Sequence, residues 1–327
     1  MTISFKTPEI SKLVFTLFFL IPAIGWSQPL LKTPVDSAEL SHVNGTFSFL
    51  IANDLGRNGY YDQKPIAEMM GQVAGLTGTE FIAALGDIHH FMGVQSIYDP
   101  LWTTNYELVY SHPELMIPWY PILGNHEYRG NTSAVINYSG ISRRWQMPSR
   151  YYSKSFVISD SVTVLLLFID TTPMIDKYRS DPQGDASKED LEKQLNWIDS
   201  TLSHSSAKWK IVMGHHPVYA GTLKVESEQT DLQNRLKPIL EKGKADFYIC
   251  GHIHIFQHIK MPSSDIDFIV NSSASLNRPV VARDGIVFFS GEPGFLLCSI
   301  DDLQIRIFLI NREGEIIYRF SRQKETI

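Results

Sequence analysis

Five short motifs of aspartate, asparagine and histidine carry residue types that bind metal ions. In chain order they are Asp54-Leu55-Gly56, Gly86-Asp87-Ile88-His89-His90, Gly124-Asn125-His126-Glu127, Gly214-His215-His216-Pro217 and Gly251-His252-Ile253-His254. A single buried histidine is usually a hydrogen-bonded core residue, but seven of the eleven histidines of this chain fall in these motifs. Oxygen ligands mixed with imidazoles suit iron, manganese or zinc better than calcium or magnesium. The motifs therefore predict a centre for such metals.

The spacing of the last two histidines would allow this centre to hold two ions. His252 and His254 are two residues apart, so in an extended segment both rings point to the same side and each could reach a different ion. Two ions also need a shared ligand. A carboxylate can bridge ions about 3.5–4 Å apart, because each of its oxygens takes one metal.

Predicted strands precede the motifs and would position them. Apolar runs predict strands at residues 47–52, 81–85, 119–123, 162–169, 209–213 and 246–250, and residues 64–76 and 188–204 predict helices. Strands that alternate with helices indicate a layered α/β fold. In such sheets ligands bind beyond the carboxyl ends of the strands, so the motifs would meet at one edge. The tail, residues 288–320, predicts antiparallel strands joined by a turn at 312–315.

With its motifs in this order, the chain resembles the calcineurin-like metallophosphoesterases and, more narrowly, the small purple acid phosphatases of the tartrate-resistant type. The similarity extends to Phe91-Met92-Gly93-Val94, Asn131-Thr132-Ser133-Ala134, Ile141-Ser142-Arg143-Arg144-Trp145 and Gly294-Phe295-Leu296. The resemblance implies an α/β fold, a four-layer α/β/β/α sandwich of two mixed β-sheets flanked by helices. It also implies a single metallophosphoesterase domain over residues 28–327.

By this resemblance the ligands divide between two ions, which would be iron paired with iron, zinc or manganese. The first ion would take Asp54, Asp87, the residue at position 90 and His254. The second would take Asp87, which bridges, together with Asn125, His215 and His252.

Position 90 departs from the purple enzymes, which owe their colour to a tyrosinate bound to ferric iron. His90 stands there instead, and a neutral imidazole removes one negative charge from the first site. Ferric iron should then be less favoured over a divalent ion. We expect divalent iron, manganese or zinc and a protein that is not purple. Alternatively His90 does not bind, and water or His89 fills the position.

Other positions also differ from the family. His89 and His216 replace aromatic residues and either line the substrate cleft or lie behind the ligands or on the surface. Lys224 is a candidate for contact with the substrate phosphate. Residues 177–189 stand where related enzymes have an exposed regulatory loop, and a plain surface loop is the simpler interpretation.

The resemblance implies hydrolysis of phosphate monoesters, with a metal-bound hydroxide attacking in line. Asn125 and His126 would offset charge in the transition state, with Asp87 holding both ions. His126 is the candidate general acid for the leaving alkoxide. Glu127 either orients His126 or is a surface carboxylate. The alternatives are a phosphodiesterase or nucleotide hydrolase, and a non-catalytic metal-binding protein.

The composition and the N-terminus indicate which partners and which cellular location to expect. The chain has 327 residues and a net charge of −6, which offers no basic stripe, so no nucleic-acid partner is expected. Lys6 and Lys12 precede an apolar run at 13–24, which is followed by Gly25-Trp26-Ser27. This predicts a signal peptide at 1–27 and a secreted or periplasmic protein.

The alternative reading of the N-terminus is a membrane anchor, but the run is shorter than the ~20 residues that a membrane span needs. The mature chain is expected to lack a span and to be a monomer that acts on a small phosphate ester. Cys250 and Cys298 are either buried thiols or a disulfide.

Overall fold

Two mixed sheets form the centre of the fold in the computed structural model, which describes residues 37–43, 46–160, 162–181, 184–222 and 226–324. Within these residues one sheet has the strand order β13-β12-β11-β1-β2-β3 and the other the order β10-β8-β9-β7-β6-β5-β4. The predicted signal peptide at 1–27 lies outside the described residues.

The strands of the first sheet are β1 (Phe47–Ala52), β2 (Phe81–Ala84), β3 (Trp119–Pro121), β11 (Gly294–Ile300), β12 (Gln304–Asn311) and β13 (Ile316–Gln323). The strands of the second are β4 (Tyr152–Ser159), β5 (Val162–Phe168), β6 (Trp209–Met213), β7 (Phe247–Cys250), β8 (Phe256–Lys260), β9 (Asp267–Val270) and β10 (Ile286–Ser290). The parallel set β1-β2-β3 has antiparallel strands on one side, next to β1, whereas β5-β6-β7-β9 has them on both sides.

The α-helices are α1 (Ser37–Ser41), α2 (Gln63–Thr77), α3 (Thr132–Asn137), α4 (Asp176–Arg179), α5 (Leu191–Ser203), α6 (Glu226–Arg235) and α7 (Lys237–Lys242). Short turns of other helix types are η1 (Trp102–Glu107), η2 (Pro113–Leu115), η3 (Glu127–Arg129), η4 (Tyr138–Gly140), η5 (Thr172–Met174) and η6 (Ala186–Lys188). None of the described helices is long and apolar enough to cross a membrane.

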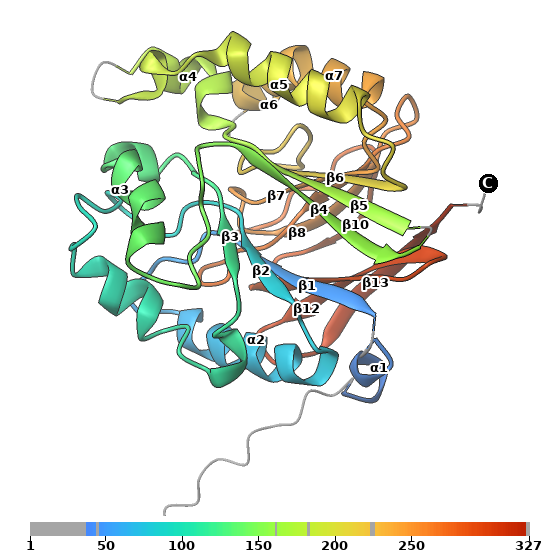
Figure 1. Ribbon diagram of the computed structural model, residues 1–327, viewed down its shortest axis with the longest axis horizontal. Helices are drawn as coiled ribbons and strands as arrows, with labels where there is room; N and C mark the ends of the chain where they lie inside the picture. The colour runs from blue at the N-terminus through green and yellow to red at the C-terminus, as the bar shows by residue number, and fades with distance from the viewer. Residues whose placement is uncertain (1–36, 44–45, 161, 182–183, 223–225, 325–327) are drawn as a thin grey trace, which may run out of the picture. The chain divides into compact units, whose positions relative to one another are not determined.

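The alternation of side chains along β5 shows how the layers are built. Val164, Leu166 and Phe168 enter the core between the sheets, whereas Leu165 and Leu167 enter a second core with the helices. Successive strand residues point to opposite faces, so one strand supplies both cores. Helices α5, α6 and α7 cover this outer face, and α2 covers the outer face of the other sheet (Figure 1). The expected arrangement of two mixed sheets flanked by helices is confirmed.

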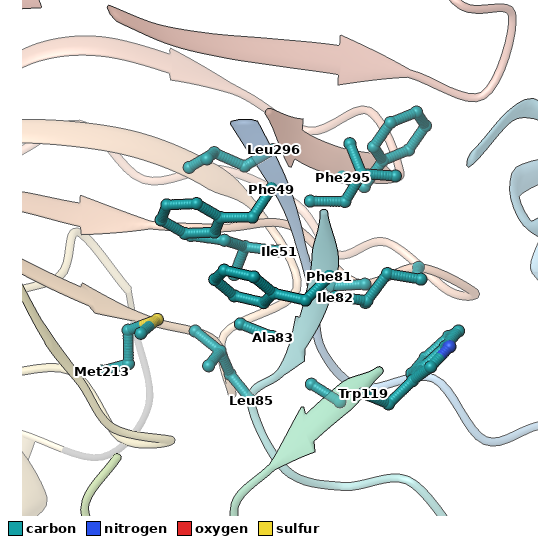
Figure 2. Packing of buried hydrophobic residues seen from close by; sticks show 14 of the residues in the cluster. Phe49, Ile51, Phe81, Ile82, Ala83, Leu85, Trp119, Met213, Phe295 and Leu296 are labelled. Atoms are coloured by element: carbon teal, nitrogen blue, oxygen red, sulfur yellow. The ribbon is translucent and has the colours of Figure 1, made fainter. Parts of the chain in front are cut away.

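Aromatic rings fill the space between the sheets. Phe49 of β1 and Phe81 of β2 stack with ring centroids 4.6 Å apart, and both point to the side on which Met213 of β6 lies (Figure 2). Ile82 and Trp119 point to the opposite face of the same sheet (Figure 2). This packing fixes β1, β2 and β6 relative to one another, and these strands carry three of the motifs at their carboxyl ends.

Most predicted elements agree with the structure. The strands at 47–52 and 209–213 have the predicted bounds, and the turn at 312–315 lies between β12 and β13. The predicted helix at 188–204 begins later, at Leu191, because the Asp190 side chain accepts a hydrogen bond of 3.0 Å from the amide of Lys193 and caps it. Cys250 and Cys298 are both buried free thiols, so the alternative of a disulfide is wrong.

Candidate metal centre

The motif residues follow the carboxyl ends of strands from both sheets, where the backbone turns sharply. Four of them have a positive φ: Asp54 (52°), Asp87 (52°), His252 (70°) and His254 (63°). A residue with a side chain rarely adopts this conformation, which costs on the order of 1–3 kcal/mol. Such strain persists only where the surroundings fix it, and it is typical of functional sites.

Three imidazoles converge on one oxygen of Asp87. Oδ2 lies 3.3 Å from Nε2 of His90, 3.3 Å from Nε2 of His215 and 3.7 Å from Nε2 of His126. The other oxygen, Oδ1, accepts a hydrogen bond of 2.9 Å from the backbone amide of His126. Asp87 is therefore anchored through Oδ1 and presents Oδ2 to the surrounding nitrogens, so it offers them a single oxygen, whereas the bridge described above uses one oxygen for each ion.

A second group of possible ligands gathers at Asp54. Its Oδ1 lies 3.1 Å from Nε2 of His254 and 3.9 Å from Nε2 of His90. Its Oδ2 accepts hydrogen bonds from the side-chain amide of Asn53 (2.7 Å) and the backbone amide of His252 (2.8 Å). His90 thus reaches both aspartates and lies between the two groups.

Backbone carbonyls fix the imidazole rings. Nδ1 of His215 donates to the carbonyl oxygen of Leu85 (2.7 Å), and Nδ1 of His254 donates to that of Leu276 (2.6 Å). A carbonyl oxygen only accepts, so each Nδ1 carries the proton and each Nε2 is free to bind a metal.

Several buried polar atoms at the centre have no hydrogen-bond partner among the described residues. They include Oδ1 of Asp54, Oδ1 of Asn125, Nδ1 of His90, Nε2 of His215 and Nε2 of His216. Buried polar atoms nearly always have a partner, so such a cluster indicates an ion. Four sets of three side chains bring one ligand atom each to within 4.8 Å of the others: His215, His216 and His252; Asp54, His90 and His254; Asp87, His90 and His126; and Asp54, Asp87 and His215. This mixed oxygen and nitrogen set fits iron, manganese or zinc.

The charges of these groups depend on one another. Burial alone would raise the pKa of Asp54 and of Asp87, but the neighbouring histidines outweigh it and hold both values below the ordinary range. Burial would lower the pKa of His215, but Asp87 outweighs it and raises the pKa to about 10. The proton on His215 thus balances part of the negative charge of the two carboxylates. A bound cation would take over this role and release that proton.

Both histidines predicted to bind substrate are fully buried. His89 places its Nδ1 2.9 Å from the side-chain amide nitrogen of Asn105, and its ring lies against Trp102. His216 places its Nδ1 2.8 Å from the hydroxyl of Thr171. Neither has a surface that substrate could contact in this conformation. Lys224 lies outside the described residues.

Glu127 has a role that neither sequence alternative described. It is fully buried, and its carboxylate accepts hydrogen bonds from four backbone amides, those of Asp87, Ile88, His89 and Gly124. None of these four hydrogen bonds comes from the His126 ring, and Glu127 is not on the surface. Glu127 instead joins the loop after β2 to the loop after β3, and so holds Asp87 beside Asn125.

The sequence matches the family Calcineurin-like phosphoesterase over residues 47–256, which includes all five motifs. The chain belongs to the calcineurin-like phosphoesterases. Purple acid phosphatase 4 of Arabidopsis thaliana is 32% identical to this phosphoesterase over 90% of this chain and 89% of its own. Human tartrate-resistant acid phosphatase type 5 is 30% identical over 77% of this chain and 82% of its own.

Solved structures share the fold of this calcineurin-like phosphoesterase. GAP50, the anchor in the inner membrane complex of Plasmodium, has a TM-score of 0.74 at 24% identity and covers 86% of this chain and 89% of its own. The purple acid phosphatase PPD1 of yellow lupin seeds has a TM-score of 0.62 at 12% identity and covers 86% of this chain and 54% of its own. Together, the family and its purple acid phosphatase relatives support a metal-dependent phosphatase.

Proposed function

We propose that this protein is an exported phosphatase that hydrolyses phosphate monoesters at a centre of two metal ions. The convergence of His90, His126 and His215 on Oδ2 of Asp87 carries this proposal, because it supplies one shared oxygen between two groups of ligands. When bound, two such ions lower the pKa of a water molecule and polarise the phosphoryl oxygens.

The side chains divide naturally between two sites. Asp54, His90 and His254 would hold the first ion, and Asn125, His215 and His252 the second, with Asp87 shared. His90 is neutral where the purple enzymes have a tyrosinate, so both ions would be divalent iron, manganese or zinc.

His126 is the proposed general acid. Its Nδ1 donates to the carbonyl oxygen of Phe91 (2.8 Å), and its ring packs on that of His90 with centroids 4.1 Å apart. These contacts aim Nε2 at the centre. In its protonated form Nε2 can pass a proton to the leaving oxygen of the ester. Burial lowers the pKa of His126 to about 4, which makes the protonated form most abundant in acid solution.

The proposed location follows from the N-terminus and from the predicted signal peptide. The mature chain would begin after Ser27 and act outside the cytoplasm as a monomer. Sequencing the N-terminus of the protein recovered from the medium or periplasm tests this. A chain that retains residues 1–27 would contradict it.

Metal quantification of the purified protein, combined with a panel of phosphate esters, tests the activity. We expect two ions per chain and faster hydrolysis of aryl phosphate monoesters than of the matching diesters. Faster diester hydrolysis would favour a phosphodiesterase. If the protein binds both ions and cleaves none of these esters, the proposal that it is an enzyme is refuted.

A further inference from the structure

Glu228 is a fully buried carboxylate beside the proposed metal centre, and it lies outside all five motifs. It stands in the first turn of α6, 24 residues before His252 in the sequence. A buried carboxylate is costly unless hydrogen bonds satisfy its oxygens. The partners of Glu228 therefore indicate what it does.

One oxygen of Glu228 faces the imidazole of His252. Oε2 lies 3.0 Å from Nε2 of that ring. A carboxylate only accepts hydrogen bonds, so Nε2 of His252 donates and carries the proton. Nδ1 is then the unprotonated nitrogen of the ring, and it is the atom left to bind an ion.

The other oxygen of Glu228 is also held. Oε1 accepts hydrogen bonds from the ammonium group of Lys177 (2.9 Å) and the hydroxyl of Tyr178 (3.1 Å), both in α4. With donors on both oxygens, the carboxylate cannot swing away from His252. Its negative charge is balanced by Lys177, whose side chain is 59% exposed.

The rest of His252 is equally constrained. Its backbone has a φ of 70°, and its amide donates to Asp54. Its ring contacts those of His215 and His216, with centroid distances of 5.1 and 4.5 Å. These contacts fix the position of the ring, whereas the hydrogen bond to Glu228 leaves Nδ1 as the nitrogen without a proton.

We propose that Glu228, supported by Lys177 and Tyr178, is a positioning residue for the second metal ion. It selects the tautomer of His252 that presents Nδ1, and so sets the affinity of that site. This inference rests on the proposed two-metal function. A carboxylate behind a histidine ligand orients the ring and increases its basicity, and losing such a partner typically weakens metal binding about 10–100-fold.

Glu228→Gln tests the inference in the full-length mature protein. His252 and Lys177 now donate to different oxygens of Glu228, and glutamine has only one acceptor oxygen. Glutamine therefore cannot accept both hydrogen bonds. Titration with Zn²⁺ against a chelator should show the second ion bound about 10–100-fold more weakly and the first ion unchanged. Glu226→Gln on the same helix is the matched control. Its side chain is 82% exposed and pairs with Arg283, so both affinities should remain those of the parent.

Glu228→Asp provides a second variant in case Glu228→Gln does not fold. It keeps the buried charge but shortens the reach to His252, so the second ion should again bind more weakly. Thermal unfolding of each metal-free variant checks that the fold is retained.

A His252→Ala background separates positioning from a merely structural role. If Glu228 acts through His252, Glu228→Gln should cause no further loss of Zn²⁺ affinity once His252 is absent. Additive losses would overturn the inference. If the parent binds two ions and the Glu228→Gln variant binds both with the same Zn²⁺ affinities, this inference alone is overturned. A parent that binds only one ion would overturn the proposed function as well.

Discussion

Nδ1 of His126 donates to the carbonyl oxygen of Phe91, and this contact leaves Nε2 of the same ring 3.7 Å from Oδ2 of Asp87. The ring can therefore face a substrate at the centre without giving up its own hydrogen bond. His126 is also the residue of its motif that keeps a partly exposed side chain, 14% of which is accessible, while Asn125 and Glu127 are buried.

His126→Ala should slow hydrolysis most for esters with poor leaving groups. General acid catalysis contributes about 10²–10⁴-fold, and a leaving group that departs without a proton needs little of it. Rates across a series of alkyl and aryl phosphates should show a steeper dependence on leaving-group pKa in the variant, with both ions retained. Exposed His204, replaced by alanine, is the control. An equal loss for every leaving group would argue against the acid role.

Asp87→Ala should remove at least one ion per chain. The substitution deletes the oxygen on which His90, His126 and His215 converge. The remaining ligands of each group would then lack their shared anion. Metal quantification after dialysis measures the loss, with exposed Asp160→Ala as the control. A variant that keeps two ions would show that Asp87 does not bridge them.

His90→Tyr should give a coloured protein when iron is bound. A phenolate at position 90 would lie beside Asp54 and Asp87, where His90 now has its Nε2, and would restore the negative charge that favours ferric iron. A visible absorption band should appear in the variant and be absent from the parent. Phe91→Tyr places the same group on a side chain that is 67% exposed, and it should remain colourless. A strong visible band in the parent would contradict the divalent assignment.

Local pattern was enough to predict much of the fold and most of the centre. The strand at 47–52 shows an apolar run, and Asp54 follows at its carboxyl end, so the element and its role could be read together. Contacts between distant segments were not readable. The hydrogen bond from His252 to Glu228 depends on how α6 packs against the sheet, and nothing in the spacing of the two residues encodes it.

Burial of polar side chains was the other property that sequence could not give. His89, His216 and Glu127 occur among motif residues that face the centre, yet all three are fully enclosed. Whether a polar residue points toward the cleft or behind it depends on the φ and ψ angles of a tight loop. The positive φ of Asp87 turns the chain just before His89, and although aspartate adopts this conformation more often than most residues, the residue type alone does not predict it.

Glu127→Ala should destabilise the fold as well as the centre. The four backbone amides that now donate hydrogen bonds to the carboxylate would lose their shared acceptor. Each buried donor without an acceptor costs about 1–3 kcal/mol, less where water enters the space, so a total loss of at least about 3 kcal/mol is expected. Urea unfolding of the metal-free protein measures it. Exposed Glu80→Ala should change stability by less than about 0.5 kcal/mol. An equally small change for Glu127 would show that the loops hold without it.

Asp170 should make the stability of the fold depend on pH. It is buried at the end of β5, where its Oδ2 accepts a hydrogen bond of 2.5 Å from the hydroxyl of Tyr128. Burial raises the pKa of Asp170 from 3.8 to about 7. Between these two values the folded chain binds a proton that the unfolded chain does not. The contribution of Asp170 to the free energy of unfolding is therefore at its maximum below pH 3.8. It decreases by about 1.4 kcal/mol per pH unit as the pH rises toward 7.

Asp170→Asn removes this titration while keeping the shape of the side chain. The free energy of unfolding of the variant, relative to that of the parent, should increase by on the order of 3–4 kcal/mol between pH 4 and pH 7. Urea unfolding of both metal-free proteins at several pH values gives this difference, and ionisations common to both cancel from it. Asp284→Asn, at an exposed position, should run parallel to the parent. If the curve for Asp170→Asn also runs parallel to that of the parent, Asp170 is already ionised in the folded protein across this range. Arg150, whose Nη1 lies 3.4 Å from the Tyr128 hydroxyl, is then the charge positioned to stabilise the carboxylate.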